Sequence, residues 1–194
     1  MIKTPKSKSL SNIDLKMNGQ SIDVVNEIKF LGVILDDKLS WSKHIQYISN
    51  KVSKGIGIIK KLRPVLNKST LINLYYAFVY PFLTYCIHVW GNTHAVHLSK
   101  LTVLQKRAIR IIAGVPARSH TGPLFLQLKL LKFEHTFKLN IALFMYRYHH
   151  GLLPEVFNLL FIRNSQYHSY ETRQNSMISM PQCRTDRSKR TIRY

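Results

Sequence analysis

The sequence predicts a mainly α-helical chain that begins with a short β element and ends in a basic, poorly ordered tail. Three observations predict this order. Apolar residues alternate with polar ones before about residue 38, recur at every third or fourth position as far as Phe161, and are sparse beyond it. Alternation is typical of strands, and recurrence by three or four is typical of helices that bury one face. Apolar residues make up 45% of the chain, which is enough for a helical core.

A turn signal near the start predicts a β-hairpin. Apolar residues alternate on both sides of Asn18-Gly19, at Ile13, Leu15 and Met17 before it and at Ile22 and Val24 after it. An Asn-Gly pair between two alternating segments favours a two-residue hairpin turn. The mostly apolar segment from Ile28 to Leu35 predicts a further, more buried strand.

Two helices are expected next. The first begins at Ser40, a candidate N-cap, and ends at Leu62 before Pro64. Its apolar stripe consists of Trp41, Ile45, Ile48, Val52, Ile56, Ile59 and Leu62. The second helix is capped by Asn67 or Ser69, and Pro81 is expected to kink or break it.

The remaining helices follow from the same spacing. A third helix is predicted from about Leu98 to Ile112, where Gly114 and Pro116 stop it. Beyond it we expect a short helix opened by Thr121-Gly122-Pro123, a long helix from Phe133 to His150, and a turn near Val156–Leu160. Residues 162–194 are polar and rich in arginine, which is typical of a disordered basic tail.

The charge of the chain is strongly positive and unevenly placed. The chain has 29 Lys and Arg residues against 9 Asp and Glu residues, for a formal net charge of +20. Between Asp37 and Glu134 the sequence has no acidic residue but 15 Lys and Arg residues. A field of one sign suits phosphate contact through counterion release, which predicts a nucleic-acid partner. Two alternatives stay open: a basic face that meets an acidic protein, and an anionic membrane surface.

One uncharged segment, Ser69 to Ser99, is long enough to cross a membrane. Pro81 lies in its middle, and its tyrosines are spread along it rather than gathered at its ends. We therefore expect buried helices and no membrane partner. The distant pair Cys86 and Cys183 gives no disulfide framework and favours a reducing, intracellular compartment, either the nucleus or the cytoplasm.

Candidate catalytic and metal-binding groups are few. Two-metal chemistry needs carboxylates from separate strands, whereas the only adjacent acidic pair, Asp36-Asp37, directly precedes a predicted helix start. Acidic residues there favour the helix N-terminus, so we expect a structural role and no catalytic residue. Side chains of zinc-ligand type occur at Cys86, His88, His94 and His97, but their spacing matches no zinc module, and no metal site is expected.

Basic residues on the predicted helices are the better candidates for function. Most of them fall away from the apolar stripe of the first helix or on the flank of the third, and aromatic residues are interleaved with them. The candidate nucleic-acid-binding residues are Lys43, Lys51, Lys54, Lys60, Lys61, Arg63, Lys106, Arg107 and Arg110.

An ordered set of short motifs runs along nearly the whole chain, from about residue 13 to residue 194. The motifs are Phe30-Leu31-Gly32-Val33-Ile34-Leu35-Asp36, Leu39-Ser40-Trp41, His44-Ile45, Leu74-Tyr75, Tyr80-Pro81-Phe82-Leu83-Thr84-Tyr85-Cys86, Val89-Trp90-Gly91, Leu104-Gln105-Lys106-Arg107-Ala108-Ile109-Arg110-Ile111-Ile112, Leu124-Phe125 and His168-Ser169-Tyr170-Glu171-Thr172-Arg173. In this order they resemble the part of non-LTR (LINE-like, jockey/CR1-type) retrotransposon reverse transcriptases that follows the catalytic palm.

The resemblance implies a division of the chain by role. Residues 1–37 would be the end of the palm with a primer-grip-like β-hairpin, in which Phe30, Leu31 and Gly32 hold the primer end. Residues 38–97 would be thumb-like helices, residues 98–161 a helical connection after the thumb, and residues 162–194 a truncated basic tail.

The resemblance also implies what this part of such an enzyme lacks. The family's catalytic aspartates would lie upstream of residue 1, so we expect a fragment of an RNA-directed DNA polymerase that does not polymerise alone. No cofactor is expected in the fragment, whereas the intact polymerase uses Mg²⁺. The expected partners are RNA, DNA or an RNA–DNA hybrid, and the missing palm and fingers of the parent polymerase. The alternative is a transposon-derived basic module that binds protein and has no nucleic-acid role.

Overall fold

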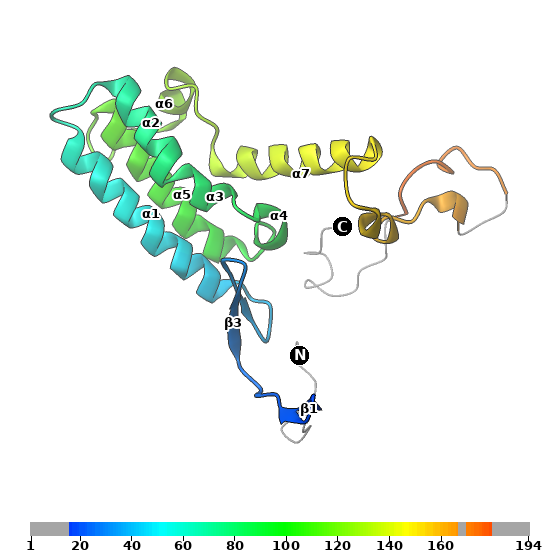
Figure 1. Ribbon diagram of the computed structural model, residues 1–194. Coiled ribbons are helices and arrows are strands. Elements are labelled where there is room, and N and C mark those ends of the chain that lie inside the picture. The colour runs from blue at the N-terminus through cyan, green and yellow to red at the C-terminus, as the bar shows by residue number, and fades with distance from the viewer. Residues whose placement is uncertain (1–15, 167–169, 180–194) are drawn as a thin grey trace. The chain divides into compact units, whose positions relative to one another are not determined.

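The computed structural model describes residues 16–166 and 170–179, which are mainly helical with two antiparallel strand pairs at their start (Figure 1). The mainly α fold class is therefore confirmed. Contacts divide the chain into two compact units. Unit 1 comprises the residues up to Leu83 together with Thr93–Leu130, and unit 2 comprises Thr84–Asn92 together with the residues from Leu131 onward. The division by role at residues 37, 97 and 161 stays a prediction.

The first strand pair confirms the predicted Asn-Gly hairpin. Strands β1 (Lys16–Met17) and β2 (Gln20–Ser21) pair antiparallel around Asn18-Gly19. Both turn residues have positive φ, 50° and 80°, as a two-residue hairpin turn of this kind requires. Ile13 and Leu15 lie outside the described residues, while Ile22 and Val24 are exposed and follow β2 without joining it.

The second strand pair corrects one prediction. Strands β3 (Glu27–Phe30) and β4 (Val33–Asp36) form an antiparallel hairpin in which Phe30 faces Val33 and Glu27 faces Asp36. The single buried strand predicted from Ile28 to Leu35 is wrong, because the chain reverses at Leu31-Gly32, with φ of 45° and 84°. Every residue of β3 is exposed. Apolar composition indicated strand structure but gave no sign of the reversal; the family resemblance did imply a hairpin here.

Three helices build the core of unit 1: α1 (Ser42–Leu62), α2 (Lys68–Phe78) and α5 (Ala95–Ala113). Helix α1 packs against both of the others (Figure 1). The predicted stripe from Ile45 to Ile59 is buried on α1, together with His44 and Ser49. Leu71 and Tyr75 are buried on α2, and Leu101, Ala108 and Ile109 are buried on α5, the two helices against which α1 packs. The Gln105 amide donates a buried hydrogen bond of 2.8 Å to the Tyr75 hydroxyl, which satisfies both groups inside this core.

Helices α1 and α5 run parallel. At their N-terminal ends the Thr93 hydroxyl donates to the Ser40 carbonyl at 3.0 Å. At their C-terminal ends the Arg63 guanidinium lies beside Gly114, which caps α5 with φ of 78°. Helix α2 provides the return between them.

The helix boundaries follow the predictions with local differences. Of the two candidate caps of α2 it is Asn67 whose side chain accepts the Thr70 N–H, at 2.8 Å. The break comes at Val79, and Pro81 lies in the first turn of α3 (Tyr80–Thr84), where its missing N–H leaves no helical hydrogen bond unmade. Helix α5 begins three residues before the predicted Leu98. The short helix α6 (Gly122–Gln127) begins with Gly122-Pro123, as predicted.

Unit 2 is built around α4 (Ile87–Trp90) and α7 (Phe133–His149). The buried Trp90 ring stacks on Phe133 with centroids 6.1 Å apart, and the His88 Nε2 lies 3.1 Å from the Asn140 carbonyl oxygen. Helix α7 was predicted to within one residue. Helix α4 was not predicted, because four residues show no periodicity.

The chain beyond α7 contains two short 3₁₀ helices, η1 (Glu155–Leu159) and η2 (Asn164–Gln166). Helix η1 lies where a turn was predicted. An isolated antiparallel bridge joins Arg163 and Ile178. Residues 167–169 and 180–194 of the predicted tail lie outside the described part of the chain.

The uncharged segment from residue 69 to residue 99 is divided among α2, α3, α4 and the start of α5. In the described ranges, no helix combines the length and the apolar character that a membrane crossing requires.

The crossing of α1 and α2 gives a matched pair of glycine substitutions. A Cβ atom on Gly55 would lie 2.5 Å from the Phe78 carbonyl oxygen, whereas a Cβ on Gly57 would meet nothing within 4 Å. We expect Gly55→Ala to lower the free energy of unfolding by about 1–3 kcal/mol. Gly57→Ala should raise it by about 0.5–1 kcal/mol, because alanine costs less backbone entropy in a helix. Urea unfolding followed by circular dichroism measures both, and equal effects of the two changes would contradict the packing of α1 on α2.

Candidate nucleic-acid interface

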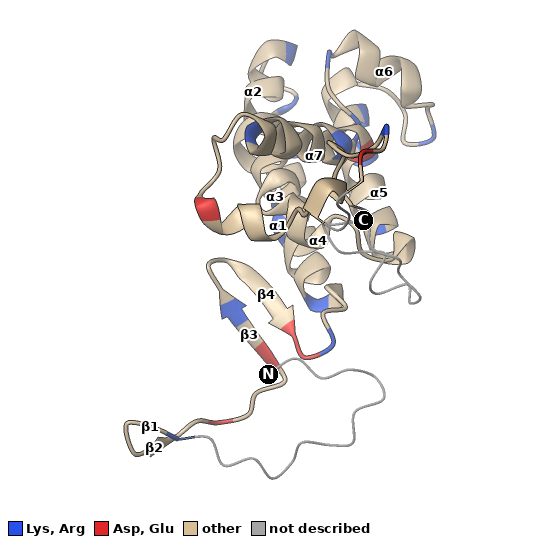
Figure 2. Ribbon diagram, turned by 90° about the vertical axis from the view of Figure 1, so that its right-hand side faces the viewer, with Lys and Arg blue, Asp and Glu red and all other residues tan. Residues whose placement is uncertain are grey.

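Charge is segregated in the described part of unit 1. The acidic residues occur around the strands, at Asp23, Glu27, Asp36 and Asp37. Every Asp, Glu, Lys or Arg position on the described helices of the unit is a Lys or an Arg (Figure 2). The acid-free stretch seen in the sequence therefore folds into the body of unit 1. Its helices present charge of one sign, while the strand region presents both signs.

The outward face of α1 carries a row of lysines. Lys43, Lys54 and Lys61 are spaced by eleven and seven residues, which are close to three and two helical turns, and all three are exposed. They lie opposite the buried stripe centred on Val52. At a rise of about 1.5 Å per residue the row extends over roughly 27 Å. Lys60 and Arg63 are also exposed, near the end of the helix.

The candidates on α5 are less uniform. Arg107 is exposed, but Lys106 and Arg110 are half-buried. The Arg110 Nε donates to the Ser119 carbonyl at 2.9 Å, so that guanidinium helps to hold the loop after α5. All nine predicted binding residues belong to unit 1, but they are divided between two segments: six lie along α1 and at its C-cap, and three lie within about one turn of α5.

The turn of the β3–β4 hairpin, which precedes α1 in the sequence, exposes apolar side chains. Phe30 is 59% exposed and Leu31 is 73% exposed, although both are large apolar side chains. Leu31 also has a left-handed backbone, which is rare for a branched residue and costs conformational energy. The predicted primer-grip-like residues Phe30, Leu31 and Gly32 thus form the exposed turn of the β3–β4 hairpin.

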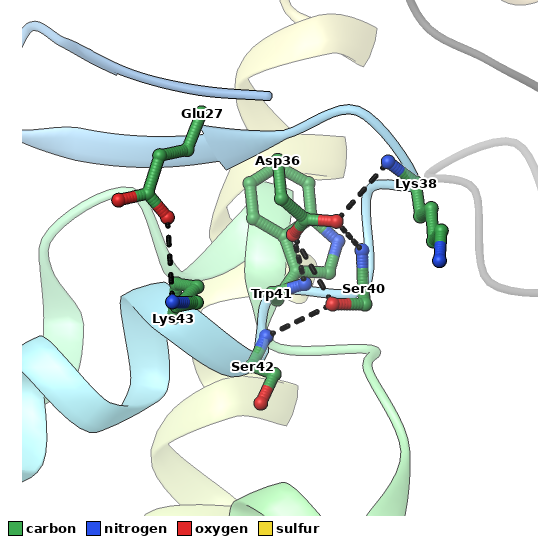
Figure 3. Close-up of polar contacts among 7 residues, drawn as sticks. All are labelled: Glu27, Asp36, Lys38, Ser40, Trp41, Ser42 and Lys43. Carbon is green, nitrogen blue, oxygen red and sulfur yellow. Dashed lines mark hydrogen bonds and ion pairs between the residues drawn. The ribbon is translucent and has the colours of Figure 1, made fainter. Parts of the chain in front are cut away.

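The Asp36 carboxylate organises the connection from this hairpin to α1 (Figure 3). It accepts the backbone N–H groups of Lys38, Ser40 and Trp41 at 3.1, 2.9 and 3.0 Å, and the Ser40 hydroxyl at 3.2 Å. Two residues of this connection, Leu39 and Trp41, have φ of 49° and 64°. One side chain therefore holds a loop whose backbone is strained at two positions.

The hydrogen bonds also fix the charge state of Asp36. Burial acts to raise its pKa, but the bonds from Ser40, Trp41 and Lys38 outweigh burial and hold the pKa below the ordinary value. The carboxylate is therefore ionised at neutral pH. Asp36 thus holds the loop before α1, while the backbone N–H of the neighbouring Asp37 donates to the Asn26 carbonyl at 3.0 Å. That neither residue of the acidic pair is catalytic stays a prediction.

The predicted N-cap, Ser40, is wrong. Helix α1 begins at Ser42, and its N-cap is Trp41, which has no side-chain capping bond. The Ser40 hydroxyl donates to Asp36 and accepts only a long contact of 3.4 Å from the Ser42 N–H. A carboxylate is a stronger acceptor than a hydroxyl, so the loop closes on Asp36 rather than on Ser40.

A buried histidine makes the second link between the hairpin and α1. The His44 Nδ1 accepts the Ile34 N–H of β4 at 3.2 Å, so the neutral ring carries its proton on Nε2. Burial lowers the pKa of His44 to about 4. The sequence indicated His44 only as part of a family motif, and its contact with β4 depends on the fold.

The structure also brings together residues that the sequence left apart. The Lys29 ammonium of β3 lies 5.0 Å from the ring centroid of Tyr47 on α1 and 3.5 Å from its hydroxyl. The Lys51 ammonium lies 5.6 Å from the same centroid. Lys29 was not among the predicted binding residues. Lys29 lies two residues from Glu27 on an exposed strand, and this position alone was only a weak indication of function. The contact with Tyr47 makes Lys29 a candidate binding residue.

The side chains of zinc-ligand type occupy other roles. Cys86 is the N-cap of α4 and His88 contacts Asn140, whereas His94 and His97 face each other across one turn with ring centroids 6.1 Å apart. Within residues 16–166 and 170–179, no three His, Cys, Asp or Glu side chains are grouped so that they could hold a metal ion.

Sequence comparison relates the chain to mobile-element polymerases. It is 34% identical over 119 residues to the RNA-directed DNA polymerase from mobile element jockey of Drosophila funebris, which covers 60% of this chain and 13% of that protein. It is 31% identical to the jockey polymerase of Drosophila melanogaster, over 61% of the chain and 13% of the relative. A probable RNA-directed DNA polymerase from transposon BS of the same species is 26% identical over 77% of the chain and 17% of the relative. No family model and no solved structure matches the chain.

The Asp36 bonds predict a large effect from a small change. Asp36→Ala removes all four acceptor contacts and leaves the loop strain unopposed, so we expect the free energy of unfolding to fall by about 2 kcal/mol or more. Asp36→Asn keeps one acceptor oxygen and should cost roughly half as much. Asp37→Asn removes the same charge one residue away and should change stability by less than about 0.5 kcal/mol. Urea unfolding of the three variants tests this order of destabilisation. The prediction is wrong if Asp37→Asn is the most destabilising of the three.

The buried His44 predicts a pH effect on stability. Its folded pKa of about 4 lies below the ordinary value of 6.5, so the unfolded chain binds the proton more readily. Stability should therefore fall as the pH is lowered from about 6.5 to about 4, by about 3 kcal/mol in total from this group. Chemical unfolding at a series of pH values measures the loss. His44→Gln keeps an acceptor but does not titrate, so its free energy of unfolding should change less with pH in this window than that of the wild type. Equal slopes for the two proteins would show that His44 is not the source of the pH dependence.

Proposed function

Because the chain is homologous to the RNA-directed DNA polymerases of non-LTR retrotransposons, we propose that it is the template–primer-binding part of such a polymerase. The chain spans only 13% to 17% of these relatives. The observation that carries the proposal is the segregation of charge in unit 1, where exposed lysines and arginines stand on helices that carry no carboxylate. In this proposal unit 1 binds RNA, DNA or their hybrid along its phosphate backbone.

The lysine row of α1 suits a nucleic-acid strand. A row of roughly 27 Å is as long as about eight steps of 3.4 Å along one strand of a duplex. Lysine ammonium groups are point charges that contact phosphates without distinguishing bases. Binding through this face is therefore sequence-tolerant, as a polymerase that copies any template requires.

The hairpin tip supplies a different kind of contact. In the proposal, the exposed Phe30 and Leu31 side chains at the turn of β3–β4 pack against the primer end, as the family resemblance implies. Asp36 and His44 hold the hairpin to the first turn of α1, so the tip keeps a defined position relative to the helix. The lysines then bind the backbone, and the tip positions the end of the strand.

Polymerisation would need a group of metal-binding carboxylates, which the described residues do not bring together. Two-metal catalysis requires carboxylates free to bind the ions. Asp36 directs its oxygens to four donors of its own loop, and the described residues contain no three-ligand cluster. The described residues therefore do not fit the Mg²⁺ of the intact polymerase. We infer that the fragment is not an enzyme on its own, and that the catalytic carboxylates belong to the parent polymerase.

Exposed apolar side chains favour a second candidate function, protein binding. Ile28 and Phe30 project from β3, and Leu139, Leu143 and Tyr146 are exposed along α7. Such side chains fit contact with the palm and fingers of the parent polymerase, or with another protein if the chain serves as an interaction module.

The lysine row predicts salt-dependent binding. Fluorescence anisotropy with an RNA–DNA hybrid should show that affinity falls steeply between about 50 and 200 mM salt. In a double variant, Lys54→Gln with Lys61→Gln, the slope of log affinity against log salt should drop by up to about 0.9 for each phosphate that is no longer neutralised.

A charge-matched control removes two cations from unit 2, by Lys138→Gln with Arg147→Gln on α7. It should leave the slope closer to the wild-type value. No binding at low salt, or binding without a salt slope, would falsify the nucleic-acid proposal. A defined complex with an acidic protein under the same conditions would then favour the interaction module.

A further inference from the structure

Three side chains at the junction of β3 and α1 form a compact basic cluster. The Lys29 and Lys51 ammonium groups lie 5.0 and 5.6 Å from the centroid of the Tyr47 ring, and Lys29 is 3.5 Å from the Tyr47 hydroxyl. Lys29 is exposed, and Tyr47 and Lys51 are half-buried. Two cations and a phenol group thus converge on one place at the surface of unit 1.

The fold creates this cluster from two regular patterns. Side chains alternate along a strand, so Glu27 and Lys29 lie on one face of β3. Residues four apart lie on one side of a helix, so Lys43, Tyr47 and Lys51 form a row along α1. The ion pair between Lys43 and Glu27, at 3.7 Å, shows that this strand face meets this helix row (Figure 3).

The ion pair leaves the cluster with an excess of positive charge. Glu27 is matched by Lys43. In the part of the chain that the structure describes, the ion pairs are Glu27–Lys43 and Glu134–His135, and neither includes Lys29 or Lys51. A ring face attracts a cation, but two cations beside one ring also repel each other. An anion bound near both ammonium groups would offset that repulsion.

We propose that Lys29, Tyr47 and Lys51 together bind one phosphate group of a nucleic-acid backbone. Each ammonium offers three N–H donors and the phenol offers one O–H, while phosphate oxygens accept. The inference rests on the proposed nucleic-acid binding and gives it a specific contact.

The site differs from the lysine row of α1 in what it connects. Lys43, Lys54 and Lys61 belong to one helix, whereas Lys29 belongs to the hairpin that carries Phe30 and Leu31. A phosphate held by Lys29 and Lys51 would join the hairpin to α1. Nucleic-acid binding would then fix the distance between the bound backbone and the hairpin tip.

The number of phosphates can be measured from the salt slope. With the full chain and a labelled DNA duplex, each neutralised phosphate contributes about 0.9 to the slope of log affinity against log salt. If both lysines bind one phosphate, the double variant Lys29→Gln with Lys51→Gln should lower the slope by about 0.9. Two independent contacts would lower it by about 1.8 and would overturn the shared site.

Two further variants complete the test. Tyr47→Phe keeps the ring and removes the hydroxyl donor, so affinity should fall a few-fold with little change in slope. Lys68→Gln removes one positive charge at the start of α2, away from the cluster, and sets the baseline for simple charge loss. A Lys29→Gln/Lys51→Gln variant with the wild-type slope would overturn the site while the proposed function stands. Failure of the wild-type chain to bind both this duplex and an RNA–DNA hybrid would instead overturn the proposed function and the site with it.

Discussion

The bond set of the Asp36 carboxylate is the constraint on which the candidate interface depends. The hairpin by itself is two strands of four residues, with β3 exposed along its length, and such a hairpin has little stability of its own. Asp36 ties the end of β4 to the start of α1 through Lys38, Ser40 and Trp41. The Ser40 carbonyl in turn accepts the Thr93 hydroxyl at the start of α5. One ionised side chain therefore links the hairpin to the two longest helices of unit 1.

Because these bonds join the hairpin to α1, chemically different groups lie in the same part of unit 1. The strand alternation puts Lys29 toward Tyr47 on one face of β3 and puts Phe30 on the other. A shift of the hairpin by one residue would exchange the two faces, so the basic cluster would lose Lys29. The His44 bond to Ile34 opposes such a shift, since it joins a defined residue of β4 to the first turn of α1. The Asp36 bonds and the His44–Ile34 bond thus set both the register of the hairpin and the position of Lys29.

The sequence predicted the parts of the fold that depend on local periodicity. The stripe from Ile45 to Ile59, the αL cap at Gly114 and the Asn67 cap each involve residues within a few positions of one another. The errors came where a local pattern was ambiguous or a distant contact decided the outcome. An apolar run cannot distinguish one strand from two joined at Leu31-Gly32. The left-handed backbone of Trp41 is held by a bond to Asp36, five residues away. The contact of Lys29 with Tyr47 joins a strand and a helix whose packing cannot be read from residue spacing.

The parallel course of α1 and α5 has an electrostatic consequence. Each helix carries a partial charge of about half an elementary charge at either end, positive at the N-terminus and negative at the C-terminus. Since the two helices point the same way, these partial charges add at both ends instead of cancelling. The negative ends coincide with Lys60 and Lys61 in the last turn of α1 and Arg110 in that of α5, so those cations are partly offset by the backbone. At the opposite end neither helix has an acidic residue in its first turn, so the positive partial charges there add to the field of the lysines. The ionised Asp36, which accepts the Trp41 N–H just before α1, offsets part of that positive end, so the parallel helices leave unit 1 with only a modest electrical polarity along their axes.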